Sequence, residues 1–117
     1  MNVTIGKKDY ELRFGFAALD YLDHEYTIET QGYTFGQGLQ IGVAYLLDHN
    51  PLALRAFIKA GTETEKSKPS NDEIEQFLMA KGDEGTLSAF FDEVLGELKK
   101  QPLTKDRLRQ VTVAMKK

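Results

Sequence analysis

The sequence predicts a mainly α fold, in which an N-terminal β-hairpin packs on a bundle of about five to six short helices. Apolar and polar residues alternate over the first 14 positions, a period typical of strands with one buried face. From Phe16 onward apolar residues recur every three or four positions, in segments bounded by Gly, Pro and helix-capping residues. With 117 residues, 41% of them hydrophobic, the chain is expected to form a single domain over 1–117.

The predicted hairpin covers residues 2–14, approximately. A Gly-Lys-Lys turn at 6–8 separates two alternating runs, whose apolar members are Val3, Ile5, Tyr10, Leu12 and Phe14. A two-stranded hairpin alone is marginally stable in water. Its apolar face is therefore expected to pack against the helices that follow.

Three helices are predicted in the first half of the chain, over about 16–25, 39–48 and 51–60. The segment 27–38 between the first two is rich in Thr, Gln and Gly, and we expect it to be a loop. Gly42 is unfavourable inside the second helix, since Gly costs about 1 kcal/mol relative to Ala. Asn50-Pro51 is a typical start for the third, which we expect to end at Gly61 as a left-handed cap.

Three more helices are predicted in the second half, over about 71–81, 86–100 and 105–115. Ser70 and Glu73 have the spacing of a capping box, and Gly82 is expected to end that helix. Pro102 stops the next helix, and Thr104 is expected to cap the last one.

The charge is unevenly distributed along the chain, whose net charge is −3. Residues 1–60 carry a net −2, residues 61–98 carry −7 and residues 99–117 carry +6. The acidic middle and the basic end can neutralise each other on the surface of a monomer, or attract each other between copies and favour a head-to-tail homo-oligomer. An acidic chain of this kind argues against nucleic acid as the main partner.

Several classes of site are not expected. Without cysteine, the chain has no disulfide framework, thiolate zinc site, iron-sulfur cluster or thiol nucleophile. His24 follows Asp20 by four residues, but two ligands are too few for a typical metal site. The glycines of 36–38 lack the third glycine and the preceding strand of a phosphate-binding loop. We therefore predict no catalytic, cofactor or metal site, and no enzyme.

No membrane association is predicted either. No run approaches the roughly 20 apolar residues of a membrane span. The first five residues lack the basic and apolar regions of a signal peptide. We expect the protein to stay in the compartment where it is made.

Three segments carry a resemblance to a known family. They are IGKKDYELRFGF at 5–16, IEQFL at 74–78, and FDEVLGELKK at 91–100 followed by Pro102-Leu103-Thr104. In this order they resemble the tail assembly chaperones of long, non-contractile-tailed phages (siphophages) and related prophages. The likeness runs from the first strand to the last helix.

The resemblance implies a non-enzymatic protein of the bacterial host cytoplasm, absent from the finished virion. Such chaperones coat the long, largely helical tape measure protein and bring tail tube subunits to it. In many such phages a ribosomal frameshift near the end of the gene yields a longer form that recruits tube protein. The ending Met115-Lys116-Lys117 is compatible with an adenine-rich slippery site.

A chaperone that covers apolar surface needs exposed apolar side chains more than a pocket. The candidates for partner binding are one face of the last helix and two aromatic residues of the central loop: Leu103, Leu108, Val111, Met115, Tyr33 and Phe35. Each of the six can equally pack in the core of the chain itself.

Two other functions remain open at this stage. One is a small acidic helical regulatory protein that binds nucleic acid or a protein partner through its basic C-terminal helix. The other is a small enzyme, whose structural sign would be a deep pocket that holds His24, Asp20 and a third ligand.

Overall fold

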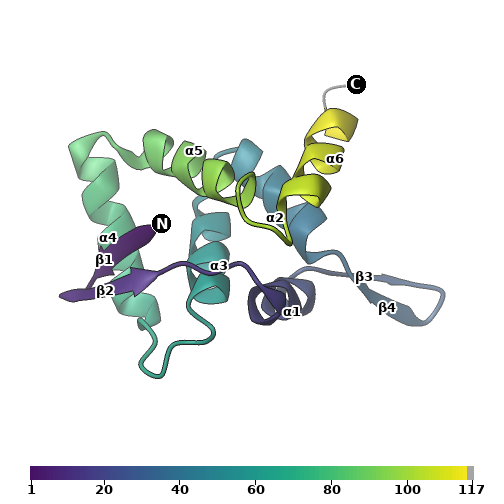
Figure 1. The fold of residues 1–117 in the computed structure, drawn as a ribbon, viewed down its shortest axis with the longest axis horizontal. Helices are drawn as coiled ribbons and strands as arrows, with labels where there is room; N and C mark the ends of the chain where they lie inside the picture. Colours follow the sequence, from purple (N-terminus) through teal and green to yellow (C-terminus); the bar gives the residue numbers. More distant parts are fainter. Residues whose placement is uncertain (116–117) are drawn as a thin grey trace.

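The computed structural model describes the backbone of residues 1–115 and the side chains of residues 1–29, 31–32 and 36–111 (Figure 1). Within this part the fold is mainly α, with six helices and two antiparallel hairpins. The predicted fold class is confirmed, because the N-terminal hairpin packs against the helices. The helices are α1 Phe16–Glu25, α2 Gly38–Leu47, α3 Pro51–Gly61, α4 Asn71–Glu84, α5 Leu87–Leu98 and α6 Lys105–Met115.

The N-terminal hairpin pairs β1, Asn2–Ile5, with β2, Lys8–Glu11. Gly6 and Lys7 in the turn both have positive φ, 57° and 70°. Two left-handed residues give a turn whose twist matches that of the flanking strands. The predicted face of the hairpin is buried, through Val3, Ile5 and Tyr10, and β1 lies against α4.

A second hairpin replaces the loop that the sequence predicted over 27–38. It pairs β3, Thr27–Thr30, with β4, Tyr33–Gly36, and it projects away from the helices (Figure 1). The prediction was wrong because the β-branched and aromatic residues of 27–35 favour paired strands despite the glycines around them. Gln31 and Gly32, with φ of 52° and 80°, supply the two left-handed positions of a tight turn.

Phe57 of α3 is fully buried in the core. Its ring meets that of Phe14 edge to face, with 6.1 Å between the ring centroids. On α2, a Cβ atom at Gly42 would lie 2.8 Å from the Phe57 ring. Gly42 thus weakens its own helix but lets α2 and α3 approach closely around this ring.

Two helices end differently from the prediction. Gly61 has no left-handed φ; it is the last residue of α3, and Thr62 follows as the C-cap. A Cβ at Gly61 would lie 3.1 Å from the Leu12 side chain, so this glycine provides space rather than a turn. α4 continues past Gly82 to Glu84, because the left-handed cap is Gly85, with φ of 76°.

Side-chain caps define the starts of α3 and α4, whereas α1, α2 and α5 begin without one. Asn50 accepts a hydrogen bond from the Leu52 amide at 3.0 Å, and Pro51 opens α3. The capping box of Ser70 and Glu73 is confirmed at the start of α4. Thr104, predicted to cap α6, is buried, and its hydroxyl donates to the Leu98 carbonyl at the end of α5.

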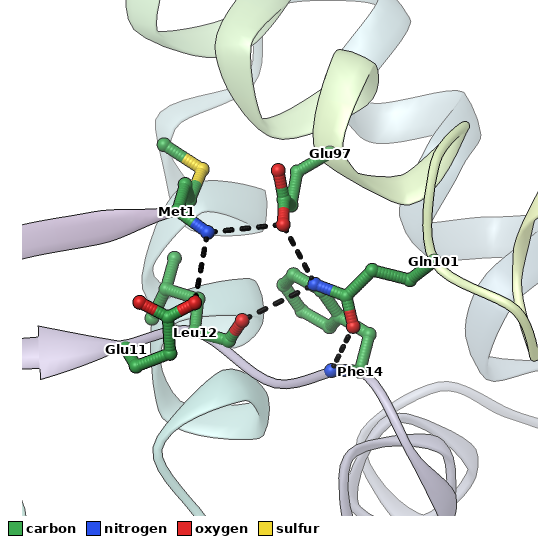
Figure 2. Close-up of polar contacts among 6 residues, drawn as sticks. All are labelled: Met1, Glu11, Leu12, Phe14, Glu97 and Gln101. Atoms are coloured by element: carbon green, nitrogen blue, oxygen red, sulfur yellow. Dashed lines mark hydrogen bonds and ion pairs between the residues drawn. The ribbon is translucent and has the colours of Figure 1, made fainter.

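A polar cluster ties the N-terminal hairpin to α5 (Figure 2). The Met1 ammonium lies 3.0 Å from Glu97 Oε1. The Gln101 amide donates to that same oxygen and to the Leu12 carbonyl, and it accepts from the Phe14 amide. These bonds hold the chain between β2 and α1 against the end of α5.

Replacement of Glu97 by Gln is expected to lower the free energy of unfolding by about 1–2 kcal/mol at neutral pH. The hydrogen bond from the Met1 ammonium, opposed by partial burial, holds the pKa of Glu97 below its ordinary value. A carboxylate with a lowered folded pKa stabilises the fold above its unfolded pKa and loses that contribution as pH falls through the folded pKa.

Urea unfolding of wild type and Glu97→Gln at pH ~7 and pH ~3 measures this effect. The difference between the two proteins should shrink at the acidic pH. Glu93→Gln, an exposed change on the same helix, is the control and should be nearly neutral. An equal difference at both pH values would show that the Glu97 carboxylate does not carry the effect.

Candidate functional site

An apolar groove lies between α3 and α4, with a volume of about 450 Å³. A water molecule occupies about 30 Å³, so the groove has room for several apolar side chains. We call it the α3–α4 groove. Its lining residues are Pro51, Leu52, Arg55, Asn71, Ile74, Glu75, Leu78, Met79, Gly82 and Leu87.

The helix periods explain how the groove forms. On α4 the lining positions recur at Asn71, Glu75, Leu78 and Gly82, which is one face of a helix. Ile74 is buried beside this face, and Leu87 of α5 completes the apolar lining. The capped starts of both helices fix where these faces meet.

Two exposed apolar side chains distinguish the groove from the rest of the surface. Leu52 is 58% exposed and Met79 is 62% exposed, and they come from different helices. Single exposed apolar residues are ordinary on a protein surface. Two that converge from separate helices on one apolar opening indicate an unfilled interface.

The two walls of the groove carry opposite charge. α3 contains Arg55 and Lys59 and no acidic residue, whereas α4 contains five acidic residues and Lys81, a net of −4. Arg55 and Glu75 both line the groove, one on each wall, and both are exposed. An occupant therefore meets an apolar floor between a basic and an acidic edge.

The residues predicted to bind a partner lie elsewhere. Leu103 is exposed, at 47%, in the connection before α6. Leu108 and Val111 are buried together in the core, where α6 packs against α2. The side chains of Tyr33, Phe35 and Met115 lie outside the described part of the structure. None of the three described residues lines the α3–α4 groove.

The sequence contains a signal for the groove in two apolar residues that lie off the buried faces of their helices. The buried stripe of α3 includes Leu54, Phe57 and Ile58, and Leu52 lies off that stripe. On α4, Met79 similarly lies off the helix face that carries the buried residue Ile74. Large apolar residues outside a buried stripe are the pattern that marks an exposed apolar face.

The histidines have local structural contacts. His24 Nδ1 lies 2.8 Å from the carbonyl oxygen of Asp20, one helical turn earlier. His49 stacks on the Phe91 ring, with 4.6 Å between ring centroids. Over residues 1–115 no group of three or more His, Cys, Asp or Glu side chains is placed to hold a metal ion.

Two further properties concern the described part of the chain. Burial, the main cause, raises the pKa of Tyr10, Tyr21 and Tyr26, the last to about 12, so these phenols stay protonated at neutral pH. None of the described helices is long and apolar enough to cross a membrane.

A small helical protein with an open apolar groove between charged walls has the architecture of a protein-binding module. The chain belongs to the phage tail assembly chaperone family: the family model "Phage tail assembly chaperone protein, TAC" matches residues 2–112. The resemblance seen in the sequence is thereby confirmed. No curated protein and no solved structure matches the chain.

Proposed function

We propose that this chain is a non-enzymatic chaperone that binds the tape measure protein of a long-tailed phage and keeps it soluble in the host cytoplasm. The observation that carries the proposal is the family match over residues 2–112. Membership of this family supports a role in phage tail assembly with protein partners. An open apolar groove suits a protein that covers the apolar faces of another chain.

The proposal extends to the tail tube. The chaperone, bound along the tape measure protein, brings tube subunits to it through a longer form of the chain and leaves before the virion is complete. Reversible release requires an interface with a modest apolar core and a polar rim. The α3–α4 groove, with its charged walls, has this composition.

The test is co-expression of the tagged chain with fragments of the tape measure protein from the same genome. Affinity capture followed by light scattering gives the mass of each complex. We expect a soluble complex with several copies of the chain for each long fragment. Recovery of the chain alone, with every fragment left in the pellet, would contradict the proposal.

We also propose that the chain self-associates through its charged segments. The acidic helix α4 and the basic helix α6 lie apart along the longest axis, with the β3–β4 hairpin beyond α6 (Figure 1), an arrangement that leaves both helices open to contact between copies. Contacts between exposed charges weaken as salt shortens the screening length.

Light scattering of the chain alone should therefore show oligomers at about 50 mM salt that dissociate toward monomer at about 1 M, where the screening length is about 3 Å. Replacement of Lys105 and Arg107 by Glu should lower the mass of the oligomer at low salt, because it removes two positive charges from α6. A mass that stays monomeric across the whole salt series would contradict self-association by charge.

A further inference from the structure

We propose that the α3–α4 groove binds an amphipathic helix of the tape measure protein, about three turns long, with one basic and one acidic edge. The basic edge of the ligand faces α4 and the acidic edge faces Arg55. This inference rests on the proposed function and names its binding site. It assigns a site and a charge pattern that the family match does not give.

The length of the ligand follows from the length of the groove. The lining residues of α4 run from Asn71 to Gly82, eleven residues later. At 1.5 Å per residue this is about 17 Å, or three turns of helix. A helix of that length presents apolar side chains at intervals of three and four residues, which can pack between Leu52 and Met79.

The charge pattern of the ligand follows from the two walls. Arg55 stands on a helix without acidic residues, and Glu75 stands on a helix with a net charge of −4. Neither side chain forms an ion pair with another residue in the described part of the chain. Both charges are thus available to a ligand, and opposite charges on its two edges would fix its position across the groove.

A second copy of the chain fits the groove less well. Its basic helix α6 has its apolar residues Leu108 and Val111 buried against its own core. Apart from Asp106, the charges of α6 that the structure describes are basic, so α6 offers little to Arg55. α6 also lies far from α4 within its own chain, so it does not cover the groove itself (Figure 1).

The first experiment repeats the capture of tape measure fragments with the double variant Leu52→Asp/Met79→Asp. Both side chains are exposed, so the variant is expected to fold, which circular dichroism and a thermal melt would check. The matched control is Phe16→Asp/Leu47→Asp, at two exposed apolar positions outside the groove. We expect the groove variant to capture at least tenfold less fragment than wild type, and the control to capture the same amount.

The outcomes separate the groove from the proposed function. Equal capture by wild type and the groove variant would show that the groove is not the binding site for the tape measure protein. The proposed chaperone function would then keep its support. A groove variant that keeps capture but loses oligomeric mass would assign the groove to a second copy, and it would also overturn the inference. No capture by wild type would count against the function, and the second experiment would then decide the groove.

The second experiment uses three labelled peptides of about 12 residues, three helical turns, with the same leucine stripe. One has Lys along one edge and Glu along the other, one has Lys on both edges, and one has Glu on both. Fluorescence anisotropy should give the mixed peptide at least fivefold tighter binding than either of the others. Glu75→Lys replaces the acidic lining residue of α4 with a basic one, so both lining charges are basic, and it should shift the preference to the peptide with two acidic edges.

Equal affinity for the three peptides, or an unchanged preference in Glu75→Lys, would overturn the charge pattern. Unchanged binding of the mixed peptide to Leu52→Asp/Met79→Asp would overturn the site itself. Loss of binding in that variant alone, with the control intact, would support it.

Discussion

Replacement of Phe57 by Ala is expected to lower the free energy of unfolding by about 3–5 kcal/mol. The ring is fully buried in α3 and meets both the Phe14 ring and the bare backbone of Gly42. Removing it leaves a cavity between α2 and α3, and backbones packed around a ring cannot collapse fully into that space. Small domains have about 5–15 kcal/mol of stability, so this loss is a large share of the total.

Urea unfolding followed by circular dichroism measures this prediction. A double-mutant cycle adds Gly42→Ala, whose new Cβ would lie 2.8 Å from the Phe57 ring in the wild-type background. Gly42→Ala should destabilise the wild type and cost much less once Phe57 is Ala, because the overlap with that ring is then gone and the Tyr26 ring lies at 3.2 Å from the new Cβ. Additive effects of the two changes would contradict the packing of the ring on Gly42.

Gly38→Ala is the second change with a large expected effect, about 3 kcal/mol or more. A Cβ at this position would lie 2.3 Å from the Leu22 carbonyl carbon and 2.5 Å from the Asp23 amide nitrogen. These are backbone atoms of α1, so no side-chain rotation relieves the overlap. The displacement would also strain the hydrogen bond from the Gly38 amide to Asp23 Oδ1, at 2.8 Å.

Gly96→Ala on α5 is the matched control, because nothing lies within 4 Å of the new Cβ. It should stabilise the fold by about 1 kcal/mol through helix propensity. The same urea titration compares both variants with wild type. A Gly38→Ala protein as stable as wild type would show that α1 and α2 do not approach each other as closely as described.

The sequence predicted the elements that local chemistry defines. The N-terminal hairpin followed from the alternation of Val3, Ile5 and Tyr10, and the start of α4 followed from the Ser70–Glu73 spacing. Each depends on residues a few positions apart, so each is visible in a short window of sequence.

The features that the sequence did not predict depend on distant contacts. The role of Gly42 depends on Phe57 of another helix, and that of Gly38 depends on the backbone of α1. The β3–β4 hairpin is the exception, since it is local: Gln31 and Gly32 form a tight turn inside a segment whose glycines are equally typical of a loop.

The candidate site could be predicted only in part. The apolar spacing of α6 predicts a partner-binding face on this helix. In the structure the same spacing buries Leu108 and Val111 in the core of the chain. The α3–α4 groove requires α3 and α4 to lie together, and no local pattern fixes that pairing. What the sequence could have shown is that Leu52 and Met79 fall outside the buried stripes of their helices.

The proposed chaperone function is tested most simply by whether the chain keeps the tape measure protein soluble. The measurement is the fraction of full-length tape measure protein in the supernatant after expression alone, with wild type, and with Leu52→Asp/Met79→Asp. We expect wild type to move most of the tape measure protein into the supernatant and the groove variant to leave it in the pellet. Equal solubility with and without the chain would show that it is not a chaperone of this protein.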